Sequence, residues 1–231
     1  LDLKKQTQEK DILLKISQAL SQTMEINGVA NTASEVVGKT LGVDRCSVIL
    51  LTEEGNHVEV RGIFSQYGAG AKKLIGKQYP IDSEPRWNNI IAKRKVLVIN
   101  DIAASPIEGI IKEHHLKEGL KSLLVTGMFF GNKLVGVLAL SSIIKPRTFT
   151  QNEIKLAQTI ANQIAVAIEN ARLMQVVKVH THELKELSSQ LMQAQEGERK
   201  RIAQELHDQV GQMLQSMKMN LDRMKRNLPI E

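Results

Sequence analysis

Residues 121–142 read KSLLVTGMFFGNKLVGVLALSS, and this stretch decides the fold of the chain. Apolar residues fill both halves, and the pair Gly131-Asn132 separates them. Because this dipeptide suits a two-residue turn, the pattern predicts two antiparallel strands, 121–130 and 133–142, joined as a tight hairpin. The fold is therefore expected to centre on an antiparallel sheet.

Helical patterns lie on both sides of this sheet. Apolar residues recur every three or four positions at the start of the chain and again from Thr150 onward. Helices at both ends of a central antiparallel sheet make an α+β fold. The other expected elements are, in chain order, helices at 1–23 and 29–41, strands at 43–51 and 57–64, and short helices at 87–92 and 108–115 on either side of a strand at 96–99.

Glycines mark several expected boundaries between these elements. Gly28 and Gly42 bound the helix at 29–41, and Gly68 with Gly70 indicates a mobile loop after the second strand. The irregular, proline-punctuated region that follows is typical of segments that line a ligand pocket.

Three runs carry a family resemblance. GNKLVGVL at 131–138, FTQNE at 149–153 and IAVAIENARL at 164–173 resemble the GAF domain, a small-molecule sensing module of many signalling proteins. The last run is highly typical of the closing helix of that domain. The resemblance covers about residues 8–174 and implies a GAF-like antiparallel sheet flanked by helices, with a possible small-molecule ligand.

The sequence leaves the identity of that ligand unknown. Members that bind cyclic nucleotides carry an aspartate where this chain has Glu153, and members that attach a bilin use a cysteine in the pocket helices, which this chain lacks. The histidines that haem would need as axial ligands are better explained as surface residues: His57, His114 and His115. Three residues are candidates for ligand binding, although core packing explains them as well: Phe64, Trp87 and Ile110.

Composition narrows the classes of function. The single cysteine, Cys46, excludes an internal disulfide and is expected in a buried strand, and no Cys/His cluster has zinc-ligand spacing, so no metal site is predicted. A net charge of +6 raises the question of nucleic-acid binding. Acidic residues interrupt the basic cluster 199–201, however, and only seven residues are Phe, Trp or Tyr. No direct contact with nucleic acid is therefore expected.

The chain has no run of 18 or more apolar residues and no signal peptide. These features predict a cytoplasmic protein without a membrane segment. The first residue is Leu1 instead of Met, which indicates a processed product or a piece of a longer parent. Further domains of that parent, including a membrane-associated part, stay open.

A helix without an obvious end follows the sheet. Residues 152–227 contain no proline and only two glycines, and about 75 helical residues would reach roughly 110 Å. Such a helix must pack on a partner, and alternating spacings of three and four predict the seam of a parallel dimeric coiled coil. The polar intervals 175–182 and 195–199 fit the seam poorly and are expected to be hinges. The expected seam residues are Ile160, Ile164, Ala167, Ala171 and Met174, then Leu184, Leu187, Leu191 and Ala194, then Leu214, Met217, Leu221, Met224 and Leu228.

Residues 198–212 read ERKRIAQELHDQVGQ and place one histidine on this helix. Apolar residues fall about 80–140° to one side of His207, and small residues one turn away on either side leave the imidazole accessible. A neutral imidazole is a competent nucleophile near neutral pH, and the adjacent Asp208 carboxylate can fix its tautomer. Gln212 lies four residues beyond Asp208, so these two side chains share a face of the helix. A histidine in these surroundings can be phosphorylated.

The same residues closely resemble the dimerization and phosphoacceptor segment of bacterial sensor histidine kinases of the nitrate-sensor and desaturase-sensor subfamily, whose motif is His-Asp-x-x-x-Gln. The resemblance covers about residues 198–227. It implies that His207 receives the γ-phosphoryl group of ATP, and that Asp208 orients the imidazole and acts as general base. It also implies that Gln212 orients the water that dephosphorylates a partner response regulator.

No glycine-rich nucleotide loop is present in the sequence. The ATP-binding kinase domain and its Mg-ATP are therefore expected in the parent. The fragment itself is expected to hold no cofactor and to be inactive as a kinase when alone.

These expectations divide the chain into four parts: an N-terminal helix at 1–23, a GAF sensor domain at 24–174, a coiled-coil signalling linker at 175–197, and a partial phosphoacceptor helix at 198–231. The expected function is the sensory and phosphoacceptor portion of a homodimeric sensor histidine kinase, which relays a small-molecule or redox signal to His207 and then to a response regulator. Two alternatives stay open, a non-enzymatic dimeric scaffold and a ligand-gated transcription regulator.

Overall fold

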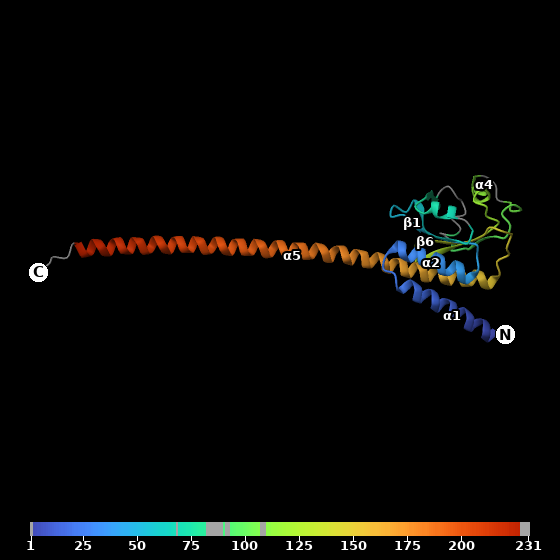
Figure 1. Ribbon diagram of the computed structural model, residues 1–231, viewed down its shortest axis with the longest axis horizontal. Coiled ribbons are helices and arrows are strands. Elements are labelled where there is room, and N and C mark those ends of the chain that lie inside the picture. Colours follow the sequence, from blue (N-terminus) through green and yellow to red (C-terminus); the bar gives the residue numbers. More distant parts are fainter. Residues whose placement is uncertain (1, 68, 82–89, 91–92, 107–109, 227–231) are drawn as a thin grey trace. The chain divides into compact units, whose positions relative to one another are not determined.

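The computed structural model describes residues 2–67, 69–81, 90, 93–106 and 110–226 (Figure 1). The chain divides into two compact units, residues 1–175 and 176–231. The first unit holds the sheet and its helices, and the second continues the last helix. None of the helices in the described part combines the length and the hydropathy that crossing a bilayer requires.

A six-stranded antiparallel sheet forms the centre of the first unit. In spatial order its strands are β3 (Gln78–Pro80), β2 (His57–Ser65), β1 (Arg45–Leu51), β6 (Lys133–Ser142), β5 (Ser122–Phe130) and β4 (Leu97–Ile99). β5 and β6 are the predicted hairpin, and Gly131 between them has φ +60, which a glycine adopts without strain. The hairpin prediction is confirmed.

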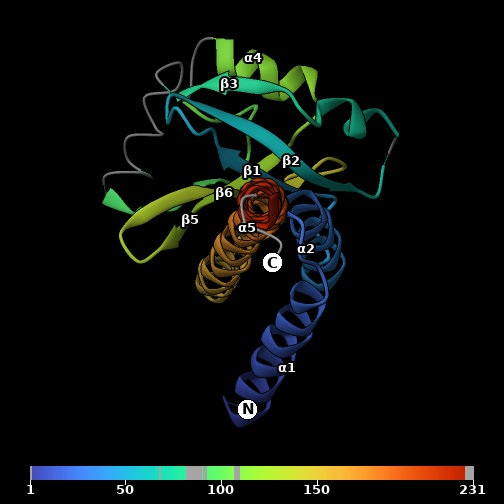
Figure 2. The same cartoon turned by 90° about the vertical axis from the view of Figure 1, so that its left-hand side faces the viewer.

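α2 (Ile26–Leu41) and the start of α5 (Gln151–Arg226) cover one face of this sheet, and the end of α1 (Asp2–Ser21) packs against this helical layer (Figure 2). Cys46 and Val48 of β1 are fully buried in the core on this side, and burial raises the pKa of the Cys46 thiol. Figure 2 shows α4 (Ile110–Lys117) on the other side of the sheet, where η1 (Ala69–Leu74) also packs against β2. The predicted α+β fold and the buried strand cysteine are confirmed.

α2 begins at Ile26, three residues before the predicted start. Gly28 lies in its first turn, and a Cβ at this position would come within 2.2 Å of the Thr23 methyl carbon. The glycine is therefore part of the helix, close to the segment that precedes it, and does not mark the helix boundary. Gly42 does end the helix as predicted, in the left-handed conformation with φ +59. Gly70, expected in a mobile loop, is part of η1.

The start of α5 is fixed by reciprocal hydrogen bonds. The Thr150 hydroxyl oxygen accepts from the Glu153 amide at 3.3 Å, and the Glu153 carboxylate accepts from the Thr150 amide at 2.8 Å. Arg147 donates to the same carboxylate at 2.5 Å and to the carbonyl oxygen of Gly42 at 2.9 Å. One arginine thereby ties the end of α2 to the first turn of α5.

Two carboxylates at this junction are held in the ionised form. Asp44 accepts hydrogen bonds from the amides of Ile143 and Ile144 at 2.7 and 3.2 Å. Burial opposes ionisation of Asp44, but these hydrogen bonds hold its pKa below the ordinary value. Burial likewise opposes ionisation of Glu153, and its hydrogen bonds from Thr150 and Arg147 lower its pKa in the same way.

The first unit should lose stability in acid. A carboxyl whose pKa is lower in the folded state contributes stability that is complete above the unfolded-state pKa and is lost as pH falls through the folded-state pKa. We expect the free energy of unfolding to fall below about pH 5, and Asp44→Asn to cost about 1 kcal/mol at pH 7 and to flatten that fall. Urea unfolding at a series of pH values measures both effects. An acid slope unchanged in Asp44→Asn would exclude this carboxylate as a source.

The first part of α5 belongs to the core of the first unit, which corrects the predicted coiled-coil seam. Ile160 and Ile164 are fully buried, and Ala171 is only 3% exposed. All three belong to the core cluster that joins α1, α2 and β1. A second chain cannot reach these side chains, because the fold of a single chain already covers them.

Candidate functional site

The exposed side of α5 carries its own apolar row, which replaces the buried residues of the predicted seam. The spacings alternate between four and three, and Leu184 and Leu187, for example, are 67% and 55% exposed. Val177 and His180 keep the alternating spacing through residues 175–182, the interval in which the sequence predicts a loss of phase. We name this row the heptad seam: Val166, Asn170, Leu173, Val177, His180, Leu184, Leu187, Leu191 and Ala194.

The heptad seam contains two polar positions. In the lettering of a coiled coil, Asn170 takes an a position and His180 takes a d position. A single asparagine at an a position is known to fix register and favour a two-stranded parallel pair, at some cost in stability. Histidine at a d position has no comparable role in fixing the register of a coiled coil.

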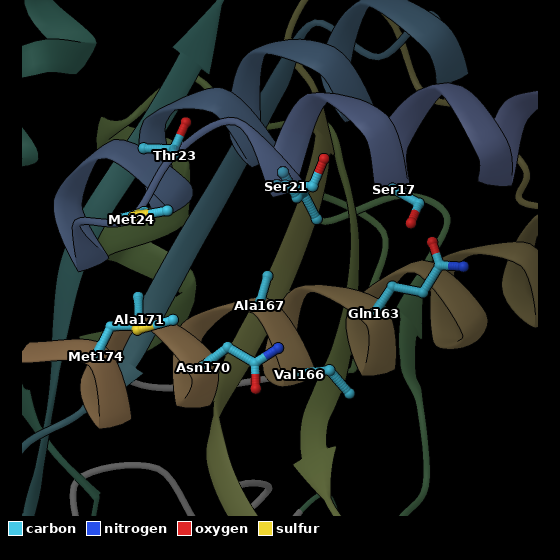
Figure 3. A pocket seen from close by; sticks show the side chains of 11 residues that line it. Ser17, Ser21, Thr23, Met24, Gln163, Val166, Ala167, Asn170, Ala171 and Met174 are labelled. Atoms are coloured by element: carbon cyan, nitrogen blue, oxygen red, sulfur yellow. The ribbon is translucent and has the colours of Figure 1, made fainter. Parts of the chain in front are cut away.

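A groove of about 390 Å³ lies beside the seam within the first unit (Figure 3). Val166 and Asn170 line it from α5, while Leu20 and Met24 line it from α1 and the residues that follow. The side-chain oxygen of Gln163 is buried there without a hydrogen-bond partner in the described part of the chain. Apolar surface therefore adjoins the first positions of the heptad seam.

A charged block ends the heptad seam. Arg201 donates to the Glu198 carboxylate at 2.5 and 2.9 Å and to the Glu205 carboxylate at 2.5 Å. The hydrogen bond with Arg201 lowers the pKa of Glu198, and that with Glu198 raises the pKa of Arg201. These three residues occupy the next positions of the heptad pattern, so the apolar row stops at this block.

A second exposed apolar row follows the charged block. Its spacings are four, four and three, an 11-residue repeat that twists in the opposite sense to heptads. On an ideal helix it is rotated by roughly 90° from the end of the heptad seam. The change of phase predicted at 195–199 therefore remains. We name these residues the C-terminal row: Ile202, Leu206, Val210, Met213, Met217, Leu221 and Met224.

His207, Asp208 and Gln212 all lie on this part of α5, and all three are exposed. By helical geometry His207 borders the C-terminal row, whereas Asp208 and Gln212 lie on the polar side of the helix. No residue that the structure describes forms a hydrogen bond or ion pair with His207. A Cβ at Gly211, one turn further along, would meet no atom within 4 Å. The imidazole is therefore open to an approaching domain.

This arrangement suits a nucleophilic histidine. A neutral imidazole attacks with the lone pair of one nitrogen, and a neighbouring carboxylate can hold the proton on the other nitrogen. Asp208, the next residue in the chain, can supply that carboxylate, although the structure records no bond between the two side chains. Because α5 neither buries nor blocks the ring, a reactant can be presented to it by a separate domain.

Of the candidate ligand-binding residues that the structure describes, Phe64 and Ile110 lie on different sides of the sheet. Phe64 packs on the helical side of the sheet, where a Cβ at Gly38 of α2 would come within 2.2 Å of its ring. Ile110 begins α4 on the other side of the sheet, and its side chain is not among those described (Figure 2). Trp87 lies outside the described residues.

Arg94 is a surface feature that the sequence did not reveal. Its φ of +51 is unusual for a residue other than glycine. Its guanidinium donates to the Gly131 carbonyl oxygen and the Asn132 side-chain oxygen, each at 3.0 Å, and lies 4.6 Å from the centre of the Phe129 ring. Together with Asn162 of α5 it lines a groove of about 420 Å³. No sequence pattern around position 94 predicts an arginine in the left-handed backbone conformation.

Two family models match the chain. The model of the GAF domain matches residues 25–168, more than half of the chain. The model described as histidine kinase matches residues 198–231, a segment that contains His207, Asp208 and Gln212. The sequence resemblances to both families are thereby confirmed.

Solved structures share the fold of the first unit. The phycoerythrobilin-bound GAF domain from a cyanobacterial phytochrome has a TM-score of 0.61 and 23% identity, over 72% of this chain and 97% of that chain. The GAF domain of an Acinetobacter phosphoenolpyruvate-protein phosphotransferase gives 0.55 and 18%, over 71% and 93%. The chromophore-binding domain of a bacteriophytochrome from R. palustris gives 0.59 and 14%, over 71% and 62%. At these identities the likeness concerns the fold alone.

The formate hydrogenlyase transcriptional activator of Salmonella typhimurium, from two strains, is similar to the chain in sequence. It is 21% identical over 179 residues, which are 76% of this chain and 25% of that protein. The chain thus spans about a quarter of the length of the curated relatives that it matches.

Proposed function

The chain belongs to the GAF domain family, and we propose that it is the sensory and phosphoacceptor portion of a cytoplasmic two-component sensor histidine kinase. One observation carries the proposal: the described part of the segment that matches histidine kinases, residues 198–226, lies on α5, the helix that starts in the GAF domain, and it exposes His207. The proposed parts are the N-terminal helix 1–23, the sensor domain 24–174, the linker 175–197 and the phosphoacceptor helix 198–231.

The proposed reaction is phosphoryl transfer from ATP to His207. A ring nitrogen of His207 forms a bond to the γ-phosphorus, the bond from that phosphorus to the β,γ-bridging oxygen breaks, and ADP leaves. Asp208 holds the imidazole in the reactive tautomer and offsets the positive charge that builds on the ring. The ATP-binding domain of the parent supplies Mg-ATP. A response regulator then accepts the phosphoryl group, and Gln212 orients the water for dephosphorylation.

A second copy of this chain is the proposed partner of α5. The heptad seam exposes apolar side chains over about four heptads, and an identical seam in parallel register would remove them from water. Asn170 at an a position favours the parallel, in-register pair. In this parallel dimer the two phosphoacceptor segments also lie at the same height along the helix axis.

We propose that the charged block is where a change in the GAF domain becomes a rotation of the helix segment that carries His207. The heptad seam and the C-terminal row have different phases and different periods, and they meet at Glu198, Arg201 and Glu205. A ligand or redox change in the GAF domain that favours one of two helix arrangements would rotate His207 toward or away from the kinase domain. This mechanism requires both arrangements to be populated.

Phosphoryl transfer in trans tests the proposed function. The chain is incubated with Mg-ATP and a separately produced ATP-binding domain of its parent or of the same kinase subfamily. We expect acid-labile, base-stable phosphate on the chain, and none with Mg-ATP alone. Labelling by Mg-ATP alone would contradict the proposal that this chain needs a separate ATP-binding domain to be phosphorylated. A dimer that is never labelled would favour a scaffold, and salt-dependent DNA binding would favour a transcription regulator.

A further inference from the structure

His180 occupies a position of the heptad seam that packing alone does not explain. It stands at a d position between Val177 and Leu184, where leucine is the ordinary choice for a parallel pair. The His180 side chain is 68% exposed in the single chain. In a parallel pair the two d residues of one layer face each other, so two imidazoles would meet across the seam.

The surroundings of His180 leave one ring nitrogen free to bind. Nδ1 of His180 lies 3.1 Å from the Glu183 carboxylate, so in the neutral ring Nδ1 carries the proton and Nε2 carries the lone pair. A carboxylate that holds one imidazole nitrogen while the other binds a metal is a recurrent arrangement in metal sites. Glu183 stands next to the seam, at a g position, and therefore holds the imidazole from the side.

We propose that the two His180 imidazoles of a dimer hold one divalent transition-metal ion between the helices. Neutral imidazole suits Zn²⁺, Ni²⁺ and Cu²⁺, whereas Mg²⁺ and Ca²⁺ prefer oxygen ligands. One chain does not suffice, because no group of three His, Cys, Asp or Glu side chains among the described residues of a single chain is placed to hold a metal. The inference rests on the proposed parallel dimer, and water completes the coordination.

A bound ion would lock the rotation of the two helices at one layer. The layer lies after the GAF segment and before the charged block, so the metal acts on the segment through which the proposed signal passes. Metal binding then biases the helix arrangement that presents His207. The site is thus a second input, separate from any ligand of the GAF domain.

His182 provides a matched control on the same helix. It is 77% exposed, and its Nε2 lies 3.6 Å from the Glu186 carboxylate. It sits about 200° around the helix from His180, on the side away from the seam. A site made by any exposed histidine beside a glutamate would use His182 equally well.

The test titrates the full chain with NiSO4, ZnCl2 and CuCl2 and measures stoichiometry by native mass spectrometry. We expect one ion per dimer, with an electron paramagnetic resonance spectrum of the Cu²⁺ form that shows two equivalent nitrogens. His180→Leu should keep the dimer and lose the ion, and Glu183→Gln should weaken binding about tenfold. His182→Ala should bind as the wild type does.

Two outcomes would overturn the inference while leaving the proposed function intact: a dimer that binds no ion, or equal loss of binding in His182→Ala and His180→Leu. Sedimentation equilibrium separates the two proposals. If the chain stays monomeric at high concentration, the proposed function and the metal site both lose their basis. If it forms a dimer that binds no metal ion, only the metal site is excluded.

Discussion

Replacing His207 with glutamine is expected to reduce phosphate incorporation in trans to background. Glutamine keeps a polar side chain of similar reach, but its amide nitrogen has no lone pair available for attack on phosphorus. The side chain of His207 is exposed and without a partner in the described structure, so the substitution should change the free energy of unfolding by less than about 0.5 kcal/mol. The measurement is acid-labile radiolabel after incubation with the kinase domain and Mg-ATP.

The control for this experiment is His182→Gln, which removes another exposed histidine from the same helix. It should incorporate phosphate at the wild-type level. If His207→Gln were still labelled, or if His182→Gln lost its label, the assignment of the phosphoacceptor to His207 would be contradicted. Circular dichroism at 222 nm confirms that both variants keep α5 helical.

Asp208 and Gln212 should affect different halves of the reaction. Asp208→Asn keeps the shape of the side chain but removes the charge that holds and balances the imidazole, so incorporation should slow by about 10²–10⁴-fold. Gln212→Ala should leave incorporation near normal and slow the dephosphorylation of the response regulator. Equal effects of both substitutions on incorporation would contradict the separate roles.

Local chemistry explains which parts of the fold could be predicted from sequence. The turn at Gly131-Asn132 and the end of α2 at Gly42 each depend on a few adjacent residues, and the structure contains both. The phosphoacceptor candidate was also found locally, because His207, Asp208 and Gln212 lie within six residues of one helix. The start of α2 was misplaced, since Gly28 lies inside the first turn of the helix, close to Thr23, and not at the end of an element.

The seam of α5 shows where local pattern fails. Spacings of three and four say which apolar residues share a side of a helix, but not what covers that side. Ile160 and Ile164 have the same spacing as a coiled-coil seam, yet the sheet and α2 cover them. Once those positions are assigned to the core, the exposed positions from Val166 to Ala194 form one row without a break. Only burial distinguishes the two rows.

Ile164→Ala and Leu187→Ala should therefore affect different properties of the protein, although both residues lie on α5. Ile164 is fully buried, so its truncation leaves a cavity and should destabilise the first unit by about 2–5 kcal/mol. Leu187 is 55% exposed in the single chain and belongs to the heptad seam, so its truncation should weaken the dimer and leave the first unit unchanged within about 0.5 kcal/mol.

Two measurements separate these effects. The only cysteine, Cys46, is fully buried in β1, so its reaction with a thiol reagent during urea unfolding follows the first unit, while sedimentation equilibrium follows the dimer. Ile164→Ala should shift the thiol-exposure transition to lower urea, and Leu187→Ala should shift only the association equilibrium. If Ile164→Ala dissociated the dimer without lowering the urea midpoint, Ile164 would face a second chain after all. The buried row would then be the seam, because a cavity in the core of a single chain cannot leave its stability untouched.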